Sequence, residues 1–129
     1  YALIDPDCPH CHAFIKELLD KNVFEERRLR LRVIPVGILS GDSLARAAML
    51  LSMPEAGQVL INHINGDKDV IPVSEDVTLA GVETNMRLIQ DWNLDVTPFL
   101  LYRAGTGELK IIRGKPKDSN TFLKDLVVN

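Results

Sequence analysis

Apolar positions in the first 40 residues show the pattern of a strand in two segments and the spacing of a helix in the segment between them. Residues 1–5 are almost wholly apolar and end at the turn Asp5-Pro6-Asp7, which predicts a strand. A helix is predicted over 9–20, where apolar side chains recur at helical spacing and Pro9 suits the first turn. Residues 29–36 alternate and then become wholly apolar, which predicts a second strand. The apolar positions of the helix are Phe14, Ile15, Leu18 and Leu19.

The rest of the chain predicts a helical segment followed by a hairpin. Helices are expected at about 43–53, 55–64 and 79–93, with Pro54 between the first two and a polar surface loop at 66–78. Strands at 97–102 and 108–113 flank the Gly-rich loop 104–107. A terminal helix is indicated by Phe122, Leu123, Leu126 and Val127. The order β-α-β, helical insertion, α-β-β-α predicts an α/β fold with a mixed sheet covered on both faces.

Composition narrows the class of protein. With 129 residues, 46% hydrophobic and 26% charged, the chain is expected to form one domain. A net charge of −3 gives no sign of a nucleic-acid partner. No apolar run reaches the roughly 18 residues of a membrane span, and no signal-peptide pattern opens the chain. Tyr1 stands in the second half of a predicted strand, so we expect further residues upstream.

The two cysteines indicate redox chemistry. Cys8 and Cys11 form a C-x-x-C run between a strand and the first turn of a helix. Positions i and i+3 share a helix face, so the sulfurs can reach bonding distance. The helix N-terminus favours a thiolate at Cys8, and Pro9 and His10 are expected to tune it. The loop they close is too short for a bridge that mainly stabilises the fold.

The same run is also compatible with other interpretations. Cys8-Pro9-His10-Cys11-His12 also matches the C-x-x-C-H attachment sequence of c-type haem, with a methionine as a further ligand. Zinc would need His12 and the distant His63, without the paired spacing of a structural site. Two inert buried thiols are the remaining alternative. We expect no metal and no cofactor. The methionines are Met49, Met53 and Met86.

Val96-Thr97-Pro98 opens the first hairpin strand. Taken alone, Pro98 is expected to be an ordinary trans proline at the start of a strand, because only about 5–6% of X-Pro bonds in folded proteins are cis.

Three runs together resemble a known family. Asp5 to His12, then Ile34-Pro35-Val36-Gly37-Ile38, then Val96-Thr97-Pro98 resemble the catalytic domain of periplasmic thiol:disulfide interchange proteins of the DsbC/DsbG type, and the DsbG branch in particular. The resemblance covers nearly the whole chain. It implies a thioredoxin-like catalytic domain over 1–129 with a helical insertion at about 42–93. It also implies that Pro98 is cis, that it faces the dithiol, and that Val96, Thr97 and Pro98 bind substrate.

The resemblance further implies roles and partners. Cys8 is expected to be the exposed attacking thiol and Cys11 the buried resolving thiol. Cysteine-containing proteins would be the substrates, and a DsbD- or DsbB-like membrane protein the redox partner, in the periplasm. The family forms homodimers through an N-terminal domain that we expect to be absent from this chain.

The sequence departs from the DsbC/DsbG pattern at one place and from the thioredoxin pattern at another. Pro9-His10 is the dipeptide of the oxidising DsbA enzymes, and Ala2 replaces the buried carboxylate of thioredoxins, so a base for Cys11 must come from elsewhere or from water. Three functions therefore compete: a disulfide isomerase or reductase, a DsbA-like dithiol oxidase, and a binding module without enzymatic activity.

Overall fold

A four-stranded mixed sheet organises the chain. The computed structural model describes residues 1–74 and 76–127. The strands lie in the order β2-β1-β3-β4; β1 pairs in parallel with β2 and antiparallel with β3, and β3 forms a hairpin with β4. In chain order the elements are β1 (Ala2–Ile4), α1 (Pro9–Asp20), β2 (Val33–Pro35), α2 (Gly41–Ser52), α3 (Ala56–Ile64), α4 (Ala80–Asp91), β3 (Phe99–Arg103), β4 (Leu109–Arg113) and α5 (Ser119–Asp125).

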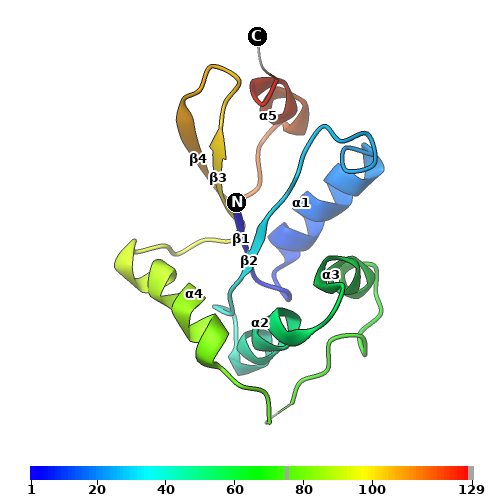
Figure 1. Ribbon diagram of the computed structural model, residues 1–129, viewed down its shortest axis with the longest axis vertical. Helices are drawn as coiled ribbons and strands as arrows, with labels where there is room; N and C mark the ends of the chain where they lie inside the picture. Colours follow the sequence, from blue (N-terminus) through cyan, green and yellow to red (C-terminus); the bar gives the residue numbers. More distant parts are fainter. Residues whose placement is uncertain (75, 128–129) are drawn as a thin grey trace.

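Helices cover both faces of this sheet (Figure 1). Side chains of β1 alternate between the faces: Ala2 and Ile4 join the core under α1 and α5, whereas Leu3 joins a smaller core under α4. Figure 1 shows α1 and α5 on one side of the strands and α4 on the other. The predicted mixed sheet with two covered faces is therefore confirmed.

Helix α1 follows directly from its sequence. Pro9 occupies its first turn, and Cys8 is the N-cap residue, with an extended backbone at φ −76° and ψ 121°. No side chain caps this end, so the first backbone N–H groups of α1 lie beside Cys8 without a competing cap. The predicted bounds 9–20 agree with the structure. The buried face carries Cys11, Phe14, Ile15 and Leu18.

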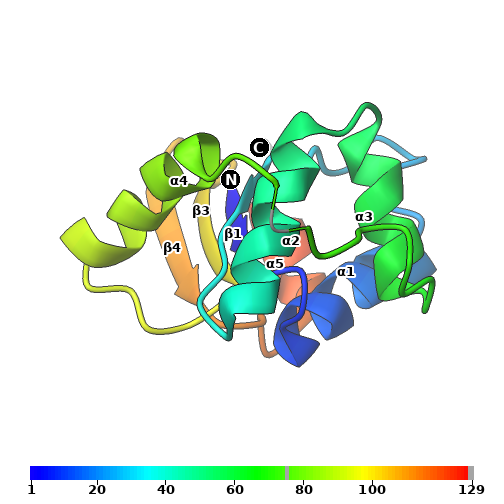
Figure 2. The same cartoon turned by 90° about the horizontal axis from the view of Figure 1, so that it is seen from below.

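Within the helical insertion, α2 and α3 lie toward α1, whereas α4 lies against the sheet (Figure 2). Helix α2 begins at Ser40, whose hydroxyl accepts from the backbone N–H of Ser43 while the Ser43 hydroxyl accepts from that of Ser40. It packs on α4 through Ala47, Ala48 and Val82, and α3 lies between α2 and α1. The insertion therefore lies beside the start of α1.

Three sequence expectations differ from the structure. The predicted strand 29–36 is paired only at Val33–Pro35, because its partner β1 is itself only three residues long. The predicted surface loop 66–78 buries Ile71 completely, and Glu75 within it lies outside the described residues. Val127 is 61% exposed beyond the end of α5. The last two residues of the predicted domain, 128–129, also lie outside the described part.

No helix within the described ranges is long and apolar enough to cross a membrane.

Candidate active site

The cysteine pair lies where β1 ends and α1 begins. The backbone N–H of Cys8 donates to the carbonyl of Asp5 at 3.1 Å, and its carbonyl accepts from the N–H of His12 at 3.0 Å. Both cysteines are free thiols. One helical turn separates them, so Cys11 lies on the buried face of α1, three residues after the N-cap residue Cys8.

The expectation that Cys8 is exposed is wrong, since only 4% of this residue is accessible. The segment before β3 covers it. The Cys8 thiol donates to the carbonyl oxygen of Thr97, with the sulfur 3.5 Å from that oxygen and 89 positions away in the sequence. Thr97 is itself 4% exposed and Pro98 is fully buried. The Thr97–Pro98 peptide bond is cis, as the resemblance implies and contrary to the expectation from Pro98 taken alone.

Cys11 is fully buried, and its surroundings favour the protonated thiol. Burial raises the pKa of Cys11 to about 12, and the nearby sulfur of Cys8 also raises it. Hydrogen bonds from the backbone of Asp5 and the side chain of Thr97 act in the opposite direction. Both of these groups can stabilise a thiolate without accepting its proton. Cys11 therefore remains a thiol at neutral pH until a reaction step removes its proton.

The other residues singled out in the sequence surround this pair at the surface. Pro9 and His10 are exposed in the first turn of α1, and Val96 is half-buried next to Thr97. Within the described residues, His10 makes no side-chain hydrogen bond. Its expected effect on the Cys8 thiolate therefore stays a prediction.

Asp5 is a buried carboxylate whose role the sequence did not indicate. It is 0% exposed, and its oxygens accept from the backbone N–H groups of Asp7 at 2.9 Å, Ile38 at 2.8 Å and Leu39 at 3.1 Å. The last two belong to the loop between β2 and α2, 33 and 34 residues further along the chain. The neutral amides of this loop thus fix the segment that leads to Cys8.

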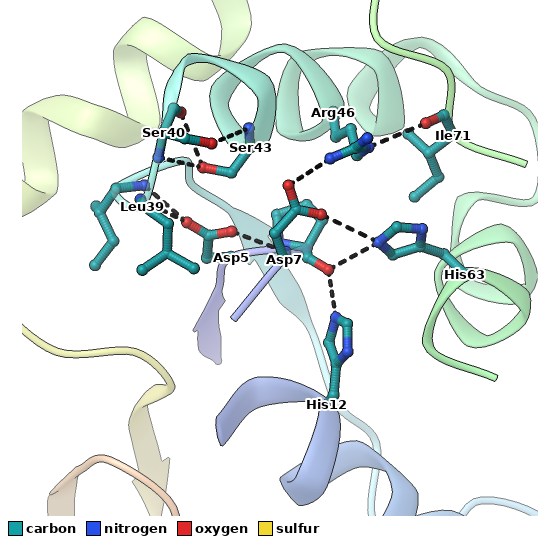
Figure 3. A network of polar contacts seen from close by, with 11 residues as sticks. Asp5, Asp7, His12, Leu39, Ser40, Ser43, Arg46, His63 and Ile71 are labelled. Atoms are coloured by element: carbon teal, nitrogen blue, oxygen red, sulfur yellow. Dashed lines mark hydrogen bonds and ion pairs between the residues drawn. The ribbon is translucent and has the colours of Figure 1, made fainter. Parts of the chain in front are cut away.

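Asp7 is the centre of a second, charged network (Figure 3). Its carboxylate accepts from the guanidinium of Arg46 at 2.5 Å, and its other oxygen lies 3.3 Å from Nε2 of His63. Arg46 comes from α2 and also donates to the carbonyl of Ile71 at 3.3 Å. The helical insertion therefore supplies the partners of the residue directly before Cys8.

Two histidines share one acceptor beneath this network. Nε2 of His63 donates to the carbonyl of Pro6 at 2.9 Å, and Nε2 of His12 contacts the same oxygen. Because a carbonyl only accepts, both rings carry their proton on Nε2. The rings meet edge to face with centroids 5.7 Å apart, and Nδ1 of His63 is buried without a partner within the described part of the chain.

The haem and zinc alternatives would require His12 as a metal ligand, and haem would also require a methionine such as Met86; in the structure both side chains have other partners. His12 is turned toward the Pro6 carbonyl, and the sulfur of Met86 accepts from the backbone N–H of Gly37 at 3.4 Å. Over residues 1–74 and 76–127, no three His, Cys, Asp or Glu side chains gather where they could hold a metal ion.

Two surface hollows differ in their lining: one borders the Asp7 network, and the other does not. One of about 330 Å³ is lined by Asp7, His12, Arg46, His63 and Lys68. A larger one, of about 650 Å³, lies between the hairpin and α5 and includes none of the residues around the dithiol. The smaller hollow is therefore the one that borders the Asp7 network, although neither cysteine lines it.

Comparison of the sequence with known proteins reveals a similarity that covers most of the chain. The chain is 29% identical, in an alignment 124 residues long that covers 91% of the chain, to the thiol:disulfide interchange protein DsbG of Pseudomonas aeruginosa. The chain is similar to DsbG. This similarity confirms the resemblance found in the sequence and, with the sheet described above, the thioredoxin fold with a helical insertion. The chain spans about half, 46%, of the length of DsbG. No family model matches the chain.

Proposed function

We propose that the chain is a thiol–disulfide oxidoreductase that exchanges disulfides with cysteine-containing proteins, as a disulfide isomerase or reductase of the DsbG/DsbC type. One observation carries the proposal. Cys8 lies at the N-terminus of α1 with its thiol on the Thr97 carbonyl, and Cys11 is buried one turn later. The similarity to DsbG supports thiol–disulfide interchange in general.

The reaction begins at Cys8. Its thiolate attacks one sulfur of a substrate disulfide; that S–S bond breaks, and the departing substrate thiolate takes a proton from solvent. The product is a mixed disulfide between Cys8 and the substrate. Cys11 then loses its proton and attacks the Cys8 sulfur, which leaves a reduced substrate and a Cys8–Cys11 disulfide. When a second substrate thiolate attacks the mixed disulfide instead, the substrate is isomerised and the dithiol is regenerated.

Val96, Thr97 and Pro98 would hold the substrate during this exchange. The Thr97 carbonyl is already a hydrogen-bond acceptor directed at Cys8. An extended substrate segment lying along residues 96–98 would bring its own cysteine to the same place and pair with backbone groups there, in the manner of strand addition. Because Cys8 is only 4% exposed, the substrate must displace the thiol from the Thr97 carbonyl as it docks.

Refolding of a protein with scrambled disulfides tests the proposal. The chain should restore native activity to scrambled ribonuclease, Cys8→Ala should be inactive, and Cys11→Ala should accumulate a mixed disulfide. Full activity of Cys8→Ala would contradict the proposal and support a binding module.

A dithiol oxidase is the second candidate, and Pro9-His10 favours it. An oxidase forms disulfides in a reduced, unfolded substrate faster than it repairs scrambled ones. His10→Tyr should make the pair less oxidising if the imidazole stabilises the Cys8 thiolate, because stabilising the reduced form raises the reduction potential. Faster oxidation than isomerisation by the unmodified chain would favour this second function.

The setting and partners follow from the same resemblance. We propose a periplasmic location, a membrane redox partner of the DsbD or DsbB type, and homodimerisation through an N-terminal domain of the kind this family carries. A mixed disulfide between Cys11→Ala and a DsbD-type reductase, but not a DsbB-type oxidase, would support the isomerase or reductase direction.

A further inference from the structure

The carboxylate of Asp7 poses an electrostatic problem for the proposed chemistry. Asp7 precedes Cys8 directly in the chain, so its negative charge is carried by the residue next to the sulfur that must become a thiolate. Two like charges on neighbouring residues oppose each other, and the less water lies between them the stronger this effect is. An unpaired Asp7 would therefore reduce the thiolate population of Cys8.

The insertion places a cation on this carboxylate. Arg46 of α2 lies 2.5 Å from one Asp7 oxygen, and its Nε is held separately by the carbonyl of Ile71. The guanidinium is thus fixed at two points and is not a loose surface side chain. Arg46 and Asp7 are each only about a fifth exposed, 23% and 22%, so solvent screens their pair less than it screens more exposed pairs such as Arg28–Glu26, at 49% and 56%.

His63 fixes the position of the same carboxylate. Its Nε2–H, directed at the Pro6 carbonyl, lies within 3.3 Å of the second Asp7 oxygen, and its side chain is only 8% exposed. The ring therefore sets where the Asp7 side chain can lie, on the side of the loop that faces the insertion (Figure 3). Arg46 supplies the charge and His63 the orientation.

We propose that Arg46 is a positioning residue of the dithiol that acts through Asp7: it neutralises the carboxylate next to Cys8 and thereby sustains the Cys8 thiolate and the oxidising strength of the pair. This inference rests on the proposed function, because it concerns the reactivity of the same thiol. It assigns to the helical insertion an influence on the redox chemistry that the C-x-x-C run alone does not contain.

Alkylation of Cys8 tests the inference without any protein substrate. In a Cys11→Ala background, where Cys8 is the only thiol, Arg46→Gln should slow the reaction with iodoacetamide at pH 7 by about threefold to tenfold. Arg46→Lys, which keeps the charge, should stay close to the parent rate. Arg28→Gln removes an equal charge from the 49%-exposed Arg28, which pairs with Glu26, and should change nothing.

Coupling to Asp7 separates this role from a general loss of structure. Asp7→Asn should not slow alkylation, and Arg46→Gln added to Asp7→Asn should have a much smaller effect than Arg46→Gln alone. An effect of equal size in both backgrounds, or no effect in either, would overturn the inference.

The equilibrium of the intact dithiol with glutathione is the second measurement. Arg46→Gln should shift it toward the oxidised protein by about threefold to tenfold, or about 15–30 mV, because tenfold corresponds to about 30 mV for two electrons. An unchanged equilibrium would overturn the inference. A parent dithiol that does not exchange with glutathione at all would overturn the proposed function, while the alkylation series would still test the role of Arg46.

Discussion

Two carboxylates two positions apart, Asp5 and Asp7, have opposite surroundings. Asp5 is fully buried and accepts only from neutral backbone amides, two of them in the loop between β2 and α2. Asp7 is 22% exposed, and its partners are the ionisable side chains of Arg46 and His63 from the insertion. Asp5 therefore has the features of a structural anchor that holds backbone segments together. Asp7 instead carries a charge that is balanced by neighbouring ionisable side chains. The predictions below test this division.

The largest effect is expected at Asp5. Asp5→Ala leaves three backbone N–H groups without their acceptor, and a buried unsatisfied donor costs about 1–3 kcal/mol. We expect the free energy of unfolding to fall by about 3–5 kcal/mol, as measured by urea denaturation of the reduced protein. Asp5→Asn should cost less, because an amide oxygen still replaces one of the two carboxylate oxygens. A loss below 1 kcal/mol for Asp5→Ala would remove the distinction between the two carboxylates.

The loop that binds Asp5 should be equally intolerant of added volume. A Cβ at Gly37 would meet the Cα of Leu44 at 2.2 Å and its backbone nitrogen at 2.4 Å, so the loop or the start of α2 must move. Gly37→Ala should destabilise the protein by about 2–3 kcal/mol. Gly41→Ala is the matched control, because nothing lies within 4 Å of its added Cβ. Equal thermal stability of the two variants would contradict this account of the loop.

The pH dependence of stability tests the surroundings of Cys11, which include a hydrogen bond from the backbone of Asp5. The pKa of Cys11 rises from 9.0 to about 12 on folding. Below pH 9 both states keep the proton, and this contribution to stability is complete. Between about pH 9 and 12 the folded state binds more protons, so stability falls by up to about 1.4 kcal/mol per pH unit. The fall should be shallower in Cys11→Ala, which retains Tyr102, whose pKa burial likewise raises to about 12. Identical slopes would contradict the elevated pKa of Cys11.

The smallest effect on stability is expected at Asp7. Asp7→Asn loses a partly exposed ion pair, and such pairs contribute about 0–1 kcal/mol when screened by water. We therefore expect less than about 1 kcal/mol of destabilisation in the same urea experiment, even though the reactivity of Cys8 should respond. A loss comparable to that of Asp5→Ala would show that both carboxylates are anchors.

Local patterns in the sequence were enough to predict much of this site. The bounds of α1 and the helix-terminal position of Cys8 follow from spacing within a dozen residues, whereas the burial of Cys11 was implied by the family resemblance. The burial of Cys8 does not follow from local spacing, because the Thr97 carbonyl that covers it is 89 positions away. The roles of Asp5 and Asp7 were missed for the same reason: apart from the Asp7 N–H that Asp5 accepts, their partners lie between 33 and 56 positions along the chain. Tyr102 and its partner Asp125 likewise gave no local signal.

The origin of Arg46 and His63 in α2 and α3 has a consequence for protein engineering. Transplanting Cys8-Pro9-His10-Cys11 onto a minimal thioredoxin scaffold would carry over the sulfurs and, with Asp7, a negative charge, but neither of the side chains that balance and orient that charge here. If Arg46 acts on the dithiol through Asp7 as proposed, a graft of residues 7–11 alone would therefore behave differently from the parent. The smallest portable unit is then residues 7–11 together with α2 and α3, and exchanging those helices would adjust redox strength without altering either cysteine.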